Sequence, residues 1–326
     1  MSNEKLLEIK NLTIHYKTDD GVVHAVNNLN LSVDRGEAVG LVGETGAGKT
    51  TTALGILKLV PNPPGKIVGG EIFIDGEDVV GKKEAGMRKI RGNKVSMIFQ
   101  DPMTSLNPVI PVGEQIAEVI RLHERTTAAE AMKKAGEMLS KVGIDPDRAK
   151  EYPHQFSGGM RQRVGIAIAL ACNPELLIAD EPTTALDVTI QAQVLELMRG
   201  LKEEFNTAMI MITHDLGIVA KICDKVAIMY AGSVVEFADK YDLFRNPKHP
   251  YTIGLFGSIP DIRGDKGTLE PIKGLMPDPS DLPSGCPFHP RCDQAVPECS
   301  QAVPENTDIG NGHFVKCVLY YGQEAK

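Results

Sequence analysis

Residues 43–50 read G-E-T-G-A-G-K-T, which fits the pattern G-x-x-x-x-G-K-[ST]. The strand-like run A-V-G-L-V precedes this stretch, and the helix-like run T-T-A-L-G-I-L-K-L follows it. Glycines at these positions let backbone N–H groups turn inward around phosphates, and the N-terminus of a helix adds partial positive charge. The sequence therefore predicts a nucleotide-binding loop between a strand and a helix.

Two residues of this loop have specific expected roles. Lys49 is expected to reach the terminal phosphates, and Thr50 to offer its hydroxyl to Mg²⁺. A glycine-rich turn that fits the pattern by chance is the alternative, and the flanking strand and helix argue against it. The other residues expected to bind nucleotide here are Gly43, Glu44, Thr45, Gly46, Ala47, Gly48 and Thr51.

A second motif is the run L-L-I-A-D-E at residues 176–181, an apolar strand that ends in two carboxylates. Phosphoryl transfer needs a carboxylate close to the metal and another close to the attacking water. Asp180 and Glu181 are the candidates for these two places. A core strand that ends in solvated acids is the alternative for this run taken alone.

The rest of the chain predicts an α/β fold. Helical patterns separate most of the later strand-like runs, which favours a mostly parallel sheet beside a smaller antiparallel one. Residues 108–153 are helical in pattern, and Thr127 with Glu130 makes a capping box, so we expect a helical insertion. The strand-like runs lie at residues 6–10, 22–33, 37–42, 71–75, 94–99, 175–180, 208–213, 225–230 and 233–237.

Composition limits the partners. The chain has 35 Lys+Arg and 43 Asp+Glu, a net charge of -8, which argues against sequence-independent binding of nucleic acid. No apolar run approaches the ~18–20 residues of a membrane-spanning helix, and the polar N-terminus lacks the apolar segment of a signal peptide. We therefore expect a cytoplasmic protein that reaches a membrane only through a partner. Pro, Gly and Asp become dense late in the chain, so we expect a domain boundary near residues 245–260.

Further motifs complete a recognisable order along the chain. Gln100 follows a strand-like run, F-S-G-G-M occupies residues 156–160, T-A-L-D ends at Asp187, and His214 lies in M-I-T-H-D. Together with the two motifs above, this order closely resembles the nucleotide-binding subunits of ABC transporters over roughly residues 5–240. The resemblance implies a P-loop ATPase domain at residues 1–250, with a parallel core sheet, an antiparallel β subdomain and a helical subdomain at about 105–160.

The resemblance also implies roles for single residues. Tyr16 matches the aromatic that stacks on adenine, for which an ordinary strand aromatic is the alternative. Gln100 matches the residue that touches Mg²⁺ and water, and Glu181 the general base. His214 matches the residue that holds the γ-phosphate and the attacking water, and Asp187 lies in the loop that couples the two ATP sites.

The family signature falls at Ser157, Gly158 and Gly159, ahead of a helix expected to start near Met160. In the family this signature serves the nucleotide bound to the opposite subunit, so two chains sandwich two ATP molecules. Phe156 and Met160 replace the commoner Leu and Gln of the signature. The S-G-G that faces the phosphate is intact.

Several strings narrow the resemblance to the ATPase subunits of bacterial dipeptide and oligopeptide importers, whose relatives also carry nickel. They are F-Q-D-P-M-T-S-L-N-P at 99–108, F-S-G-G-M-R-Q-R at 156–163, P-K-H-P-Y-T at 247–252 and P-S-G-C-P-F-H-P-R-C at 283–292.

This branch implies a set of partners and a location. The partners are a second, related ATPase subunit, two transmembrane permease subunits and an extracellular peptide-binding protein, with no nucleic acid. The location is peripheral, at the cytoplasmic face of the bacterial membrane. Nickel import by the same machinery and a soluble iron-sulfur ABC ATPase that acts on ribosomes or nucleic acid are the alternatives.

Residues 251–326 form the expected loop-rich C-terminal appendage, and its cysteines suggest a metal. Five, six and seventeen residues separate Cys286, Cys292, Cys299 and Cys317. Four thiolates can hold either a [4Fe–4S] cluster or a tetrahedral zinc ion, and zinc sites usually show the closer spacing C-x₂₋₄-C. The resemblance favours a [4Fe–4S] cluster, with zinc and free thiols as alternatives. A structural role is expected before redox sensing, and Cys172 and Cys223 are expected in the core.

Overall fold

The computed structural model describes residues 5–101, 105–184, 186–258 and 272–322. Residues 102–104 of the 99–108 string, Ala185 of the T-A-L-D motif and residues 259–271, next to the expected boundary, lie outside the described residues. The chain forms two compact units. Unit 1 comprises Met1–Leu7, Val33–Ala38 and Phe73–Thr213, and unit 2 comprises Glu8–Ser32, Val39–Ile72 and His214–Lys326.

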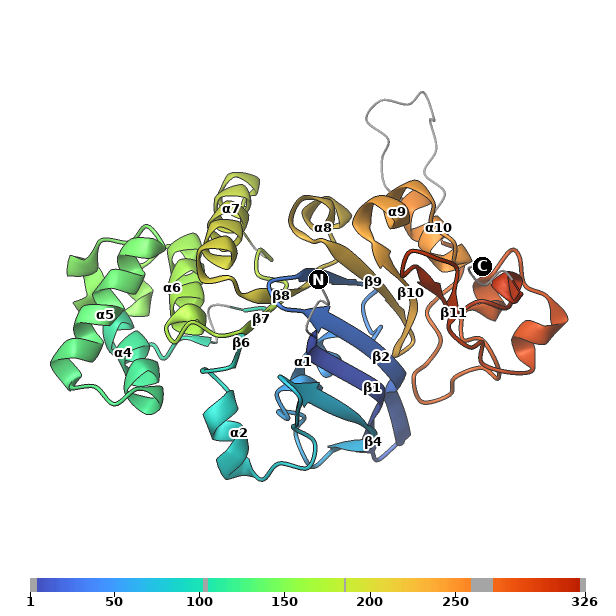
Figure 1. The fold of residues 1–326 in the computed structure, drawn as a ribbon, viewed down its shortest axis with the longest axis horizontal. Helices are drawn as coiled ribbons and strands as arrows, with labels where there is room; N and C mark the ends of the chain where they lie inside the picture. Colours follow the sequence, from blue (N-terminus) through green and yellow to red (C-terminus); the bar gives the residue numbers. More distant parts are fainter. Residues whose placement is uncertain (1–4, 102–104, 185, 259–271, 323–326) are drawn as a thin grey trace. The chain divides into compact units, whose positions relative to one another are not determined.

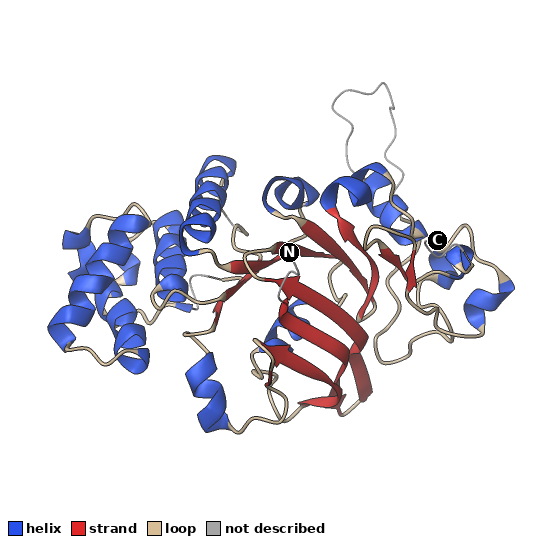
Figure 2. Ribbon diagram, viewed as in Figure 1, coloured by secondary structure: helices blue, strands red, loops and turns tan. Residues whose placement is uncertain are grey.

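Parallel strands of the core sheet lie in unit 1 (Figure 2). They are β6 (Val95–Ile98), β7 (Leu176–Asp180) and β8 (Ala208–Ile212), in the order β8–β7–β6. Every residue of β7 and β8 is buried, as expected of continuous aliphatic runs in a parallel sheet. The strands predicted at these three places are confirmed, with ends that differ by at most one residue.

The helices predicted within residues 108–153 are also confirmed. At the start of α5, the Thr127 hydroxyl accepts a hydrogen bond from the Glu130 N–H at 3.2 Å, and the Glu130 carboxylate accepts one from the Thr127 N–H at 3.0 Å, which is the predicted capping box. The helices of unit 1 are α2 (Glu84–Ile90), α4 (Val112–His123), α5 (Ala128–Lys141), α6 (Gly158–Leu170) and α7 (Val188–Phe205), with 3₁₀ turns η1 (Pro146–Lys150) and η2 (Pro153–Gln155) (Figure 1).

A second, four-stranded sheet has the order β2–β1–β4–β5. Its strands are β1 (Lys5–Thr18), β2 (Gly21–Asp34), β4 (Gly65–Ile74) and the short β5 (Glu77–Asp78), and β5 pairs antiparallel with the end of β4. The first two strands are each longer than their predicted runs. Polar residues on the exposed side of a strand weaken the apolar signal at its ends without ending the strand.

Unit 2 contains the part of the core sheet that carries the phosphate-binding loop. Strand β3 (Ala38–Val42) is parallel to β9 (Lys225–Tyr230), and β9 is antiparallel to β10 (Ser233–Asp239). Strand β12 (Phe314–Val315) then pairs with β10, and β11 (Thr307–Asp308) pairs with β12. The last described part of the chain therefore extends this sheet through backbone hydrogen bonds.

The remaining elements of unit 2 are short. They are α1 (Lys49–Ile56), α8 (Leu216–Ile222), α9 (Lys240–Arg245), α10 (Pro250–Gly257) and the 3₁₀ turns η3 (His289–Arg291), η4 (Pro297–Ser300) and η5 (Val318–Tyr320). Within residues 272–322 only 3₁₀ turns and two-residue strands occur, so the C-terminal part is loop-rich as predicted. Among the described residues, no helix has the length and apolar character needed to cross a membrane.

Candidate functional site

The predicted phosphate-binding loop lies between β3 and α1. Gly48 caps α1 with a φ of 97°, and a Cβ at this position would lie 2.4 Å from the Ala25 carbonyl oxygen, so only glycine fits. The side chain of Lys49 is buried, and its Nζ donates to the carbonyl oxygens of Gly43 at 2.7 Å and Glu44 at 3.0 Å. The loop therefore holds its ammonium group in place before any phosphate is bound.

The three threonines in the first turn of α1 differ in their exposure. Thr50 is exposed and Thr51 is half-buried, whereas Thr52 is buried and donates its hydroxyl to the Gly48 carbonyl oxygen at 2.9 Å. An exposed hydroxyl at the N-terminus of a helix suits an oxygen-preferring cation such as Mg²⁺. The donors and acceptors of this loop therefore fit a magnesium-bound nucleotide.

Two other predicted nucleotide contacts belong to unit 2. Tyr16 lies half-buried on β1, and its ring edge rests on the backbone of Gly65, where a Cβ would come within 2.7 Å of Tyr16 Cε1. His214 is exposed between the end of β8 and the start of α8. The stacking of Tyr16 on adenine and the γ-phosphate contact of His214 stay predictions.

In unit 1, Glu181 follows β7 in a left-handed backbone conformation with a φ of 45°. Its N–H donates to the Ile212 carbonyl oxygen at 2.9 Å. Its carboxylate accepts hydrogen bonds from Gln100 Nε2 at 3.0 Å and from the Thr184 hydroxyl at 2.9 Å. A non-glycine residue keeps this sparsely populated conformation only where its surroundings fix it, and such residues cluster at functional sites.

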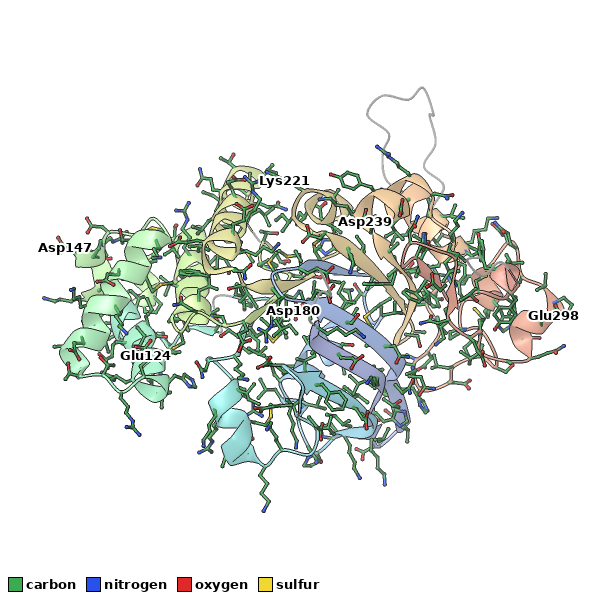
Figure 3. All side chains as sticks on the ribbon, in the orientation of Figure 1. Glu124, Asp147, Asp180, Lys221, Asp239 and Glu298 are labelled. Carbon is green, nitrogen blue, oxygen red and sulfur yellow. The ribbon has the colours of Figure 1, made fainter. Side chains whose placement is uncertain are left out.

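The residues beside Glu181 differ in part from what the sequence predicted. Gln100 was expected on Mg²⁺ and water, and here its amide donates to the Glu181 carboxylate. Asp180, labelled in Figure 3, ends β7. Its side chain is buried, with 2% exposed. Thr184 was not predicted, although a hydroxyl three residues after a candidate base was a usable signal.

The signature residues start a helix earlier than expected. Helix α6 begins at Gly158, two residues before Met160, because Ser157 caps it and accepts from the Met160 N–H at 3.3 Å. Asp187 likewise caps α7, and its carboxylate accepts from the Ile190 N–H at 3.0 Å. Both residues thus have a structural role within unit 1 besides the roles that the resemblance implies.

The predicted site residues fall into two groups, one in each unit. Unit 2 carries Tyr16, Gly43, Glu44, Thr45, Gly46, Ala47, Gly48, Lys49, Thr50, Thr51 and His214, and unit 1 carries Gln100, Ser157, Gly158, Gly159, Asp180, Glu181 and Asp187.

The four C-terminal cysteines line one small cavity in unit 2. Cys286, Cys292, Cys299 and Cys317 are all free thiols around a cavity of about 10 Å³. That volume is about the room for one water molecule, so a four-iron cluster does not fit between the thiols as they are placed. Among the described residues, no three His, Cys, Asp or Glu side chains form a group that could hold a metal ion. The structure therefore brings the predicted ligands together without forming the predicted metal site.

Burial governs the acidity of these thiols. It raises the pKa of Cys286 and of Cys292, and it raises the pKa of Cys317 to about 11. The three thiols therefore keep their protons at neutral pH, and a metal would have to displace those protons. Of the two cysteines expected in the core, Cys223 is fully buried and Cys172 is half-buried.

Two residues of the C-terminal part contact the phosphate-binding loop. Arg291 forms an ion pair with Glu44, with Nη1 at 2.9 Å from Oε2, and the Tyr251 hydroxyl accepts a hydrogen bond from the Glu44 N–H at 3.0 Å. Sequence reasoning missed both contacts. Both residues lie in strings quoted above only for resemblance, and more than 200 positions separate them from the loop.

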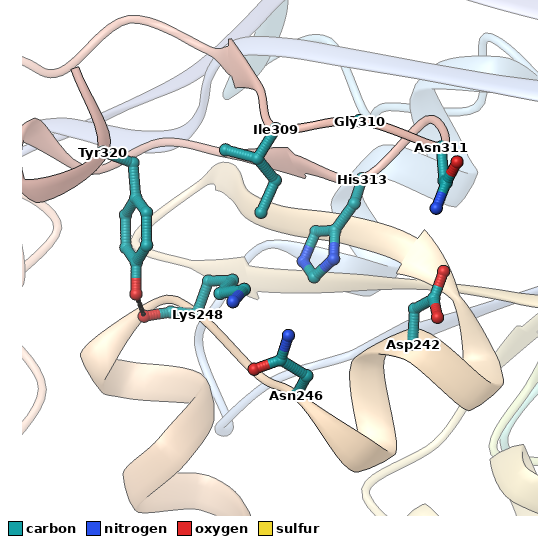
Figure 4. A pocket seen from close by; sticks show the side chains of 8 residues that line it. All are labelled: Asp242, Asn246, Lys248, Ile309, Gly310, Asn311, His313 and Tyr320. Carbon is teal, nitrogen blue, oxygen red and sulfur yellow. Dashed lines mark hydrogen bonds between the residues drawn. The ribbon is translucent and has the colours of Figure 1, made fainter. Parts of the chain in front are cut away.

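A separate polar pocket of about 240 Å³ lies in unit 2 (Figure 4). The buried His313 ring faces it and bonds Glu236 at 2.8 Å, and the Tyr320 hydroxyl donates to the Lys248 carbonyl oxygen at 2.9 Å. The Glu236 carboxylate also accepts from the backbone N–H groups of Lys248 and His249. These bonds tie the hairpin of β11 and β12 and the 3₁₀ turn η5 to the segment between α9 and α10. The pocket is lined by Asp242, Asn246, Lys248, Ile309, Gly310, Asn311, His313 and Tyr320.

Comparison with known proteins agrees with this geometry. The phosphate-binding loop before α1 and the acidic pair Asp180 and Glu181 at the end of β7 are typical of a P-loop ATPase. The ABC transporter family model matches residues 26–184. The ATP-binding cassette MJ0796, solved as a dimer in a post-hydrolysis state with ADP and Pi, is 30% identical, with a TM-score of 0.65 over 72% of this chain and 98% of that one. CbiO1 of Clostridium perfringens is 27% identical, with a TM-score of 0.64 over 74% of this chain and 92% of that one.

Relatives and the C-terminal region identify the branch. The model described as "Oligopeptide/dipeptide transporter, C-terminal region" matches residues 235–299. The oligopeptide transport ATP-binding protein AppD of Bacillus subtilis is 51% identical over 98% of each chain. The oligopeptide transport ATP-binding protein OppD of Escherichia coli is 50% identical over 90% of this chain and 87% of its own. The chain therefore belongs to the ATP-binding subunits of oligopeptide and dipeptide ABC transporters, and it is an ATPase.

Proposed function

We propose that the chain binds magnesium-ATP at residues 43–51, hydrolyses it with Glu181 as general base, and thereby powers peptide import through a membrane transporter. The observation that carries the catalytic part is the Glu181 carboxylate, which two donors hold at the end of a buried strand. The matching C-terminal region and the names of the relatives support peptides as the cargo.

The chemistry follows from the groups in each unit. Lys49, which the carbonyl oxygens of Gly43 and Glu44 hold in place, donates to the terminal phosphates. Glu181 takes a proton from the attacking water while Gln100 and Thr184 fix the direction of its carboxylate. His214 holds the γ-phosphate and that water, and the ring of Tyr16 stacks on adenine.

Magnesium and the second subunit complete the proposed site. Mg²⁺, when bound, neutralises charge on the phosphate oxygens, and Thr50, Gln100 and Asp180 are the residues that would hold it. Ser157, Gly158 and Gly159 serve the nucleotide of a second ATPase subunit, a related chain in a heterodimer, and Asp187 couples the two sites.

The assembly converts dimer closure into transport. Two permease subunits turn closure and reopening into alternating access, and an extracellular binding protein delivers the peptide. The chain then lies peripherally at the cytoplasmic face of the membrane. Within it, residues 1–250 form the ATPase domain, with the helical subdomain at about 105–160, and residues 251–326 form the C-terminal region.

Substrate competition tests the proposed cargo. Vesicles with the complete transporter would take up a labelled oligopeptide while an excess of dipeptide, of a second oligopeptide or of Ni²⁺ is added. We expect competition by the oligopeptide, and competition by the dipeptide would place the smaller peptides in the same class. Competition by Ni²⁺ alone would replace peptide import with nickel import. Recovery of the chain with ribosomes in place of its permease would favour the soluble alternative.

We further propose that Cys286, Cys292, Cys299 and Cys317 bind a metal centre, a [4Fe–4S] cluster in preference to zinc, which staples the loop-rich C-terminal part. The convergence of four thiols on one cavity supports this proposal. Binding requires the thiols to lose their protons and to move apart around the cluster. Protein purified anaerobically should contain about four irons and four sulfides per chain. One zinc would replace the cluster with a zinc site, and metal-free protein would contradict both.

A further inference from the structure

Arg291 lies at the end of η3, between Cys286 and Cys292, and its side chain points to the phosphate-binding loop. The side chain is only 7% exposed, and its guanidinium group bonds both carboxylate oxygens of Glu44, at 2.9 and 3.3 Å. Glu44 is the second residue of the loop. A nearly buried fork of this kind fixes both position and orientation, which a single point charge does not.

Every donor of this guanidinium group has a partner. Besides the two bonds to Glu44, Nε donates to the Lys273 carbonyl oxygen at 2.9 Å, Nη2 to the Gly274 carbonyl oxygen at 3.3 Å and Nη1 to the Tyr230 hydroxyl at 3.3 Å. Arginine has five N–H donors in a rigid plane, and all five are used here. A lysine has three donors and cannot reproduce this set.

Tyr251 holds the backbone of the same loop residue. Its hydroxyl accepts from the Glu44 N–H at 3.0 Å, and its ring is fully buried. The ring contacts Tyr230, with centroids 4.6 Å apart, and Phe288, with centroids 5.4 Å apart. Phe288 also lines the cysteine cavity. The aromatic cluster thus connects the wall of that cavity to the backbone of the loop.

This support becomes important when nucleotide binds. Without phosphate, Lys49 donates to the carbonyl oxygens of Gly43 and Glu44 and so helps to fix the loop. Where Lys49 exchanges one of those bonds for a bond to phosphate, the side chain and the N–H of Glu44 are still fixed by Arg291 and Tyr251, which keep the loop in shape.

We propose that Arg291 is a positioning residue that holds the phosphate-binding loop through Glu44, so that the C-terminal part around the cysteines sets the affinity of the chain for ATP. The inference rests on the proposed nucleotide site. It assigns the C-terminal part a role in ATP binding, whether or not a metal occupies the cysteine cavity.

A double-mutant cycle on the full-length chain tests this inference. The dissociation constant for ATP would be measured for the wild type, Arg291→Lys, Glu44→Ala and the double variant, together with the Tm of each protein without nucleotide. We expect each single variant to weaken ATP binding about tenfold, which is the size of one charge-assisted hydrogen bond. The double variant should bind ATP no more weakly than the single variant with the lower affinity. Asp293→Asn, an exposed neighbour in the same segment, is the matched control and should bind ATP as the wild type does.

Each other outcome has a defined meaning. Independent, multiplicative losses would show that Arg291 does not act through Glu44 and would overturn the inference, as would an unchanged dissociation constant in Arg291→Lys. A lower Tm with unchanged ATP binding would make Arg291 a structural staple only. If Arg291→Lys does not fold, Glu44→Ala reports the contact from the loop side, and wild-type affinity there overturns the inference. A wild type that does not bind ATP would instead contradict the proposed function.

Discussion

The phosphate-binding loop and the cysteine cavity belong to the same unit, yet they differ in how sequence encodes them. The loop occupies eight consecutive residues, and its glycines, its helix cap and Lys49 meet through local backbone geometry. The cysteines come from four separated positions, and they meet only because the whole C-terminal part is folded. A contiguous motif therefore specifies its geometry, whereas a dispersed one specifies only its chemistry.

The contiguous acidic pair at the end of β7, Asp180 and Glu181, should show the largest effect. Glu181→Gln keeps the size of the side chain but removes the proton acceptor, so ATP hydrolysis by the assembled transporter should fall about 10²- to 10⁴-fold while ATP binding persists. Turnover and nucleotide binding would be measured in parallel. Glu175→Gln, at a half-buried carboxylate just before the same strand, is the control, and equal turnover in the two variants would contradict the assignment.

The next largest effect should come from one methyl group in the loop. Gly48→Ala places a Cβ 2.4 Å from the Ala25 carbonyl oxygen at a φ of 97°, so we expect a stability loss of about 3 kcal/mol and no detectable ATP binding. Gly46→Ala has a similar φ of 85° with nothing within 4 Å, and it should lose only about 1–2 kcal/mol. Denaturant unfolding and ATP titration compare them, and equal losses would mean that the close approach at Gly48 is not decisive.

His249 lines the cysteine cavity and bonds Tyr251, which contacts the phosphate-binding loop. It should make the stability of the chain depend on pH. It caps α10, and its Nδ1 accepts from the N–H of Tyr251 at 3.1 Å. Burial lowers the pKa of His249 from 6.5 to about 4. The unfolded chain therefore takes up the proton first, and stability falls as the pH drops from about 6.5 to about 4, by up to about 3 kcal/mol.

A variant isolates this pH dependence. Asparagine caps helices as an acceptor but does not titrate, so the Tm of His249→Asn should fall less between pH 6.5 and 4.5 than that of the wild type. Parallel Tm curves for the two proteins would show that His249 does not carry the effect.

The smallest effect on stability should come from a single dispersed cysteine. Cys299→Ser should abolish binding at the proposed metal centre, because one ligand of four is removed. It should cost the metal-free chain only about 1 kcal/mol, because the contacts of the phosphate-binding loop remain. Cys172→Ser, outside the cavity, should keep the metal. Metal content and Tm would be measured on both variants. Full metal content in Cys299→Ser would exclude this thiol as a ligand.

Most of the fold could be predicted from the sequence where a local signal was strong. The buried strands β7 and β8 and the capping box of α5 are continuous patterns, and the structure confirms them. Helix α6 begins two residues before Met160, near which it was predicted. The prediction gave Ser157 only a contact with phosphate and not its role as the cap of the helix. The hairpin of β11 and β12 has only two-residue strands, which carry too few residues for a periodic signal.

The site could be predicted in part for the same reason. Lys49 and Glu181 lie within contiguous motifs, so their positions followed from the strand and the helix beside them. The bonds of Gln100 and Thr184 to Glu181, and of Arg291 to Glu44, depend on tertiary packing across long stretches of chain. No local pattern encodes such contacts, and the same limit explains why the sequence predicted four cysteine ligands but not the small volume between them.

The most direct test of the account measures ATP hydrolysed and peptide accumulated in the same vesicles over the same interval. The complete transporter would be supplied with its peptide-loaded binding protein. We expect peptide to accumulate only with ATP hydrolysis, and Glu181→Gln to stop both together. Peptide that accumulates without hydrolysis, or hydrolysis that never moves peptide in the wild type, would contradict the proposal that this ATPase powers peptide import.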